Sequence, residues 1–129
     1  MRKLTRSPKQ KPNLPLSKEK SLETNLDNLK KITFRCDTFL LDKVRNNLAS
    51  QHLAGNYQYS NLSYFFRSAL HAYQHGMTLT YQREPNNPRK EISFRLTEEL
   101  MTFYNSLPPR SKTAILERAL GTYYYQYLN

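Results

Sequence analysis

Two short stretches of the chain alternate polar and apolar side chains with a period of two. The first covers residues 30–36 (KKITFRC) and the second covers residues 90–96 (KEISFRL). This period is typical of a β-strand with one buried face and one exposed face. The alternation predicts six inward side chains, Ile32, Phe34, Cys36, Ile92, Phe94 and Leu96.

The first predicted strand is followed by apolar residues at helical spacing. Asp37 is a candidate N-cap for a helix whose apolar face would consist of Phe39, Leu40, Val44 and Leu48. A loop from about residue 49 to residue 60 is expected to lead into a second helix, which Gly76 would end.

The second predicted strand is also followed by two predicted helices, over fewer residues. Thr97 is a candidate N-cap for a helix that Pro108 and Pro109 would interrupt. Ser111 is then expected to cap a last helix, and a run of tyrosines ends it. The chain therefore carries one strand-helix-helix pattern twice.

The two copies match position by position. Residues 32–35 (ITFR) align with residues 92–95 (ISFR), sixty residues later, whereas residues 61–70 align with residues 111–120, fifty residues later. We therefore expect the loop between the helices of the first copy to be ten residues longer. Two matches in the same order, with the same predicted elements, favour a duplicated unit over coincidence.

A single unit of this kind could not be stable alone. A lone strand has two unpaired edges, and forty-odd residues bury too little apolar surface. Two units solve both problems if their strands pair antiparallel and their helices share one core. We therefore expect a mainly α fold with a two-stranded antiparallel ribbon, in which the two units form an intramolecular pseudo-dimer. The expected parts are a basic, largely disordered arm (1–29), a first unit (30–77), a linker (78–88) and a second unit (89–129).

The charge of the chain limits its partners. Among 129 residues there are 20 Lys and Arg against 10 Asp and Glu, a formal net charge of +10, which favours nucleic acid or an acidic membrane surface as partner. The only cysteine, Cys36, excludes an intrachain disulfide and a zinc site built from cysteines. No apolar run approaches the roughly 20 residues that span a bilayer, and no signal peptide is evident. We expect a cytoplasmic protein without a membrane partner.

This arrangement resembles the ribbon-helix-helix DNA-binding family of the Arc/MetJ type, over about residues 30–127. Two copies in one chain look more like the tandem ribbon-helix-helix accessory proteins of conjugative plasmids. The resemblance implies that the ribbon enters the major groove of double-stranded DNA, which is wide enough for two strands. Nucleoid association, self-association on adjacent sites and a further protein partner are additional expectations.

The outward side chains of the ribbon match the family's base-reading positions. They are Lys31, Thr33, Arg35, Glu91, Ser93 and Arg95. If the pseudo-dyad passes between Thr33 and Ser93, Lys31 lies opposite Arg95 and Arg35 opposite Glu91. Glu91 could accept a hydrogen bond from cytosine N4 or form a cross-strand pair with Arg35, and we favour the pair. The alternative for all six is an ordinary solvated sheet face.

The family also implies phosphate contacts where each second helix begins, because free N–H groups and the helix dipole favour an anion there. The matching positions are Asn61, Ser63, Ser111, Lys112 and Thr113. Their alternative role is helix capping alone. The basic arm could add nonspecific phosphate contacts or remain unbound.

The sequence offers little support for other chemistry. His71 and His75 lie one helical turn apart, but we interpret them as a solvated pair, and we expect no metal, no cofactor and no catalytic residue. We expect a sequence-specific DNA-binding protein that acts as a transcriptional repressor or regulator, or as a plasmid-origin accessory factor. The alternative is an antitoxin-like module that binds a toxin as well as DNA. Binding of single-stranded RNA would need outward aromatic side chains, which the predicted ribbon lacks.

Overall fold

The computed structural model describes residues 29–128. Its elements are β1 (Lys30–Asp37), α2 (Thr38–Leu53), α3 (Leu62–Gln74), β2 (Arg89–Leu96), α4 (Glu98–Ser106) and α5 (Lys112–Tyr123). A 3₁₀ turn (Pro109–Ser111) precedes α5, and a π-helical turn (Tyr124–Leu128) follows it. The predicted basic arm lies outside the described residues, apart from Leu29, which is buried.

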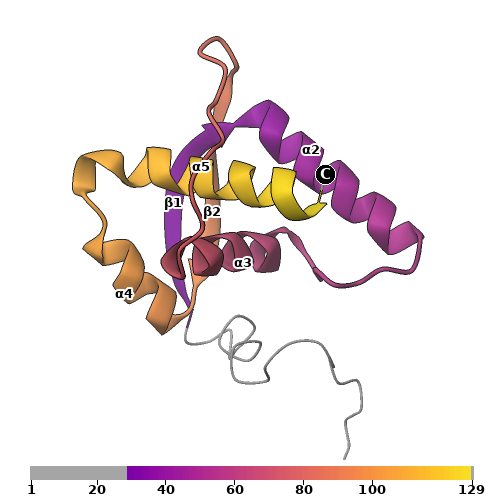
Figure 1. The fold of residues 1–129 in the computed structure, drawn as a ribbon, viewed down its shortest axis with the longest axis horizontal. Coiled ribbons are helices and arrows are strands. Elements are labelled where there is room, and N and C mark those ends of the chain that lie inside the picture. Colours follow the sequence, from indigo (N-terminus) through magenta and orange to yellow (C-terminus); the bar gives the residue numbers. More distant parts are fainter. Residues whose placement is uncertain (1–28, 129) are drawn as a thin grey trace, which may run out of the picture.

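The two strands pair antiparallel and form the only sheet among residues 29–128. In Figure 1, α5 crosses in front of this ribbon, while α2 and α4 lie on opposite sides of it. Helices α3 and α5 pack against each other, with α3 also against β2 and α5 against β1. Each of these two helices therefore contacts the strand of the other sequence repeat. The expected mainly α fold with a two-stranded ribbon is confirmed.

The inward face of the ribbon forms part of the core. Five of the six predicted inward residues are buried, and Ile92 is half-buried. The ring of Phe66 on α3 stacks on Phe94 with centroids 4.2 Å apart, and Phe34 lies 5.6 Å from Phe66. Burial raises the pKa of the Cys36 thiol to about 12, so this side chain remains a protonated core group.

Helix α2 corrects three expectations, which concern its end, the length of the connection after it and the exposure of Phe39. Helix α2 continues to Leu53, beyond the predicted start of the loop. Because α2 has 16 residues and α4 has 9, seven of the ten extra residues of the first copy extend a helix. Only three lengthen the connection, which covers residues 54–61 in the first copy and 107–111 in the second. Phe39, predicted on the apolar face of this helix, is 51% exposed.

The predicted caps are confirmed at two of three positions. The side chain of Asp37 accepts hydrogen bonds from the backbone N–H groups of Phe39 and Leu40, and Thr97 caps α4 by accepting from Leu100. Ser111 ends the 3₁₀ turn and makes no side-chain capping bond, because its backbone is helical, whereas an N-cap residue is typically extended. Gly76, with a φ of 108°, follows the end of α3 as expected.

The segment that joins the two repeats is fixed along α5. The N–H groups of Thr80 and Tyr81 both donate to Oγ1 of Thr122 at 3.0 Å, and Arg118 donates to the carbonyl of Tyr81. The ring of Tyr81 lies directly over Gly121, where a side chain would overlap it. Glycine at this helical position therefore makes room for the linker.

Replacing Gly121 with alanine should destabilise the protein. Alanine favours a helix by about 1 kcal/mol over glycine, but overpacking against Tyr81 typically costs about 1–3 kcal/mol. We expect a net loss in the free energy of unfolding, measured by equilibrium urea unfolding. In a Tyr81→Ala background the same change should be neutral or stabilising, and equal losses in both backgrounds would contradict the steric explanation.

Candidate nucleic-acid interface

The outward face of the ribbon presents the six residues expected to read bases. The register pairs Thr33 with Ser93, Lys31 with Arg95 and Arg35 with Glu91, as the sequence predicts. All six side chains are exposed. This face points away from the helices, because alternate residues of the same strands are buried beneath α3 and α5. The structure thus brings these residues together on one polar surface, while their role in reading bases stays a prediction.

A hydrogen bond marks the centre of this surface. The hydroxyls of Thr33 and Ser93 lie 2.8 Å apart across the strands. One hydroxyl proton is used between them, and one remains free to point outward. The pair can therefore offer one donor together with its free lone pairs to another molecule.

The two ends of the face differ in charge. Lys31 lies opposite Arg95, and like charges in directly opposed positions destabilise a sheet unless an anion neutralises them. At the other end Arg35 lies opposite Glu91, yet no ion pair within 4 Å joins these two described residues. The favoured cross-strand pair is therefore not formed in this structure. Because the strands twist and both side chains are long and solvated, the Arg35 guanidinium and the Glu91 carboxylate can remain apart, and both face solvent.

The expected phosphate positions differ between the two copies. Helices α3 and α5 begin on opposite sides of the ribbon in Figure 1. At α3, the Asn61 side chain accepts from the N–H of Tyr64 at 2.8 Å, so the capping role is confirmed there. At α5 there is no side-chain cap, and the ammonium group of Lys112 lies 4.5 Å from the ring centroid of Tyr104. Ser63 and Thr113 are half-buried at these helix starts. Phosphate binding at both places stays a prediction.

A buried acidic cluster joins one end of the ribbon to the linker and α5. Glu117 is 3% exposed and accepts a 2.6 Å hydrogen bond from the backbone N–H of Asp37. The guanidinium groups of Arg83 and Arg89 lie 3.6 Å and 3.7 Å from the second oxygen of Glu117. The sequence did not indicate this cluster, because its members are up to 80 residues apart and follow no periodic pattern.

Asp37 does more than cap a helix. Besides the two backbone N–H groups of α2, it accepts hydrogen bonds from the Tyr81 hydroxyl at 2.8 Å and the Asn87 amide at 3.0 Å. Burial acts to raise the pKa of Asp37, but these four hydrogen bonds outweigh it and lower the pKa. The carboxylate is therefore ionised and fully bonded, which ties the linker to the strand.

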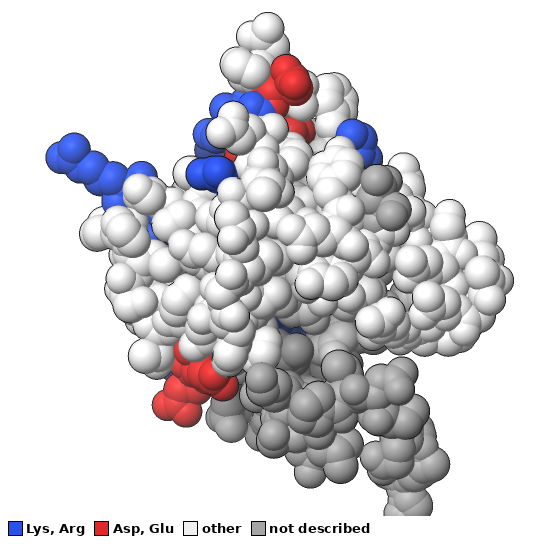
Figure 2. Space-filling view, in the orientation of Figure 1, with Lys and Arg blue, Asp and Glu red and all other residues white. Residues whose placement is uncertain are grey.

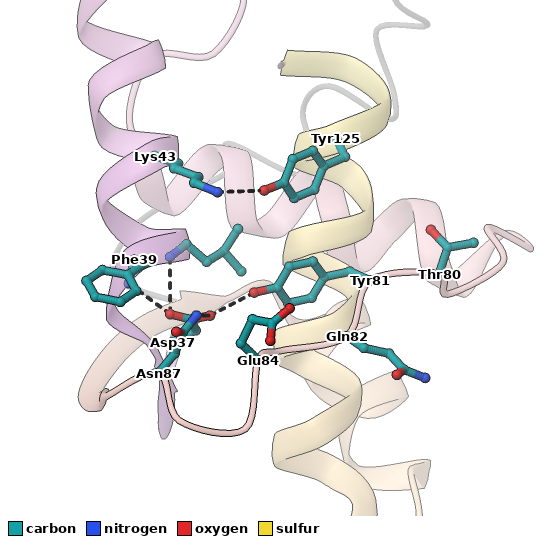
Figure 3. A pocket seen from close by; sticks show the side chains of 10 residues that line it. Asp37, Phe39, Lys43, Thr80, Tyr81, Gln82, Glu84, Asn87 and Tyr125 are labelled. Carbon is teal, nitrogen blue, oxygen red and sulfur yellow. Dashed lines mark hydrogen bonds between the residues drawn. The ribbon is translucent and has the colours of Figure 1, made fainter.

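A cavity of about 380 Å³ lies beside this carboxylate. Figure 3 shows the side chains that line it. Phe39 and Lys43 of α2 lie on one side and Tyr81 and Tyr125 on the other. Lys43 donates to the hydroxyl of Tyr125 at 2.9 Å, so the chain's own groups bridge the cavity. Asp37 is bonded to Tyr81 and Asn87 of the linker at the same place, and we assign the cavity to the docking of the linker.

Two histidines lie close together at the end of α3. The rings of His71 and His75 lie 4.2 Å apart, but residues 29–128 contain no group of three or more His, Cys, Asp or Glu that could hold a metal ion. Within the same range no helix is long and apolar enough to cross a bilayer.

Comparison with known proteins adds no relative from which a function could be transferred. No protein-family model matches the chain, and neither a curated protein nor a solved structure matches it.

Proposed function

We propose that this protein binds double-stranded DNA by inserting the outward face of its ribbon into the major groove. In this proposal the chain is a tandem ribbon-helix-helix protein that acts as a transcriptional regulator or a plasmid-origin accessory factor. The observation that carries the proposal is the register of the ribbon. It is symmetrical about Thr33 and Ser93 and presents six polar side chains, three of them basic and one acidic, on one exposed surface.

The helix contacts support two units related by a pseudo-twofold axis. Arg67 on α3 donates to the backbone oxygen of Arg95 on β2 at 3.1 Å. The aligned residue of the second copy, Glu117 on α5, accepts from the backbone N–H of Asp37 at the end of β1. Each second helix thus uses a buried charged side chain at the same aligned position to hold the strand of the other repeat. Because the repeats share one chain, each half is present to the other at a high effective concentration.

The side chains of the ribbon suit base edges in the major groove. Arg35 and Arg95 can each make two hydrogen bonds to guanine O6 and N7, and Glu91 can accept from cytosine N4. Glu91 is available for this contact because it makes no ion pair with Arg35. Since the two strands carry different triplets, the proposed DNA site is asymmetric.

Replacing Arg95 with alanine should relax base preference at one position of the site. The loss of discrimination should be about 1–3 kcal/mol, the usual value of a bidentate guanine contact. Sites selected from random duplex DNA, followed by affinity measurements on matched and mismatched duplexes, would reveal it.

Lys112→Ala is the matched comparison, because it removes a cation from a predicted phosphate contact. It should weaken binding to all sequences and reduce the slope of log affinity against log salt by about 0.9. Equal weakening of all sequences by Arg95→Ala would contradict its base-reading role. Failure of the wild-type chain to bind any duplex at low salt would overturn the proposed function.

A further inference from the structure

Two segments without Lys, Arg, Asp or Glu lie side by side in the fold. They are residues 46–66, from the middle of α2 into α3, and residues 119–128, which end the described chain. The hydroxyls of Tyr59 and Tyr123 lie 2.9 Å apart and join the two segments. In Figure 2, the surface over the end of α2 and the adjoining connection carries no blue or red side chains. A protein with a net charge of +10 therefore has a broad uncharged surface.

Exposed apolar side chains concentrate on this surface. Five large ones are exposed among the described residues, and four of them lie in these two segments. Tyr125 contacts Lys43 and Tyr81 at the linker. The other three are Leu53, Tyr57 and Tyr127, which we call the tyrosine face. Leu53 is 91% exposed and Tyr57 65% exposed. The ring centroids of His52 and Tyr57 lie 5.2 Å apart, and those of Tyr123 and Tyr127 lie 4.6 Å apart. Neighbouring rings therefore pack against both exposed tyrosines. Exposed tyrosine together with a depletion of charge is the composition of the core of a protein interface.

The tyrosine face is not used by the pairing of the two repeats. Leu53 and Tyr57 belong to the extension of α2 and the connection after it, which have no counterpart beside the shorter α4. In Figure 1 the end of α2, the connection after it and the end of the described chain lie to one side of the ribbon. The outward residues of the ribbon point away from α3 and α5. The tyrosine face therefore exists once in each chain and would remain accessible when the ribbon is bound to DNA.

We propose that the tyrosine face binds the same face of a second copy of this chain. Tyrosine hydroxyls and the nearby amides of Gln58 and Gln126 both donate and accept hydrogen bonds, so such a surface can satisfy an identical copy across a twofold axis. A surface of lysines or of carboxylates could not bind an identical copy in this way, because like charges would face each other. Two chains of charge +10 repel each other least where neither presents a charge. The proposal concerns a surface other than the ribbon and does not rest on DNA binding.

The test is the oligomeric state of the full chain without DNA. Sedimentation equilibrium should give a concentration-dependent mass that approaches twice that of one chain. Dimerisation should strengthen as salt rises, because salt screens the repulsion between chains, whereas DNA binding should weaken. A Tyr57→Lys/Tyr127→Lys variant should lose the dimer, and Asn105→Lys, an exposed position on α4, should keep it. Circular dichroism of all variants would establish that they are folded.

Two results would overturn the proposal. One is a wild-type chain that stays monomeric at every soluble concentration and at high salt. The other is a dimer that survives the paired tyrosine substitutions, because its interface would then lie elsewhere. In either case duplex binding by the same samples would still measure the proposed function separately.

Discussion

Glu117→Ala should lower the free energy of unfolding by about 3 kcal/mol. Removing one partner of a buried ion pair typically costs about 3–5 kcal/mol, because the other charge is left uncompensated. Here the lower part of that range applies, since the side chains of Arg83 and Arg89 retain 21% and 34% exposure. The backbone N–H of Asp37 would also lose its acceptor at the end of β1. Equilibrium urea unfolding would measure the loss.

Glu117→Gln separates the contribution of the ion pair from that of the hydrogen bond to Asp37. Glutamine keeps an oxygen that can accept from the N–H of Asp37 but removes the charge that faces the two arginines. It should therefore destabilise the protein less than alanine does. Double variants with Arg83→Ala should show coupling, because the two side chains interact directly. An alanine variant as stable as the wild type would mean that the acidic cluster is not what holds the linker end of the ribbon.

The ribbon could be predicted from sequence because its signal is local and repeated. Strict alternation assigned inner and outer faces, and the aligned ITFR and ISFR segments fixed which residues oppose each other. A shift of one residue would have exposed Phe34 and Phe94, so the apolar pattern leaves little freedom of register. The central Thr33–Ser93 pair follows directly from that symmetry.

The acidic cluster could not be predicted in the same way. Asp37 and Glu117 each satisfied a local expectation, as an N-cap and as part of the second repeat, and nothing local indicates that they meet. The extension of α2 was missed for a related reason. Residues 49–53 (ASQHL) carry no strong helix breaker, and the residues that indicate a loop, Gly55 and Asn56, come only after them.

Glu91→Lys should convert the proposed asymmetric DNA site into a nearly palindromic one. The outward triplet of β1 is Lys31, Thr33 and Arg35, and this change would give β2 a triplet of the same chemistry. At the base contacted by Glu91, an acceptor for cytosine N4 becomes a donor for guanine O6 and N7. Each of these preferences is worth about 1–3 kcal/mol, so the selected base should switch from cytosine to guanine.

Selection from random duplex DNA by the wild type and the variant would measure this switch. Glu91→Gln is the control, because it removes the charge without adding a cation and its amide both donates and accepts. It should weaken the cytosine preference without creating the guanine preference. Because the ribbon is symmetrical in register and asymmetric only in its side chains, the shape of the selected site tests whether those six side chains read DNA. A site that is palindromic for the wild type, or unchanged by Glu91→Lys, would contradict their proposed role.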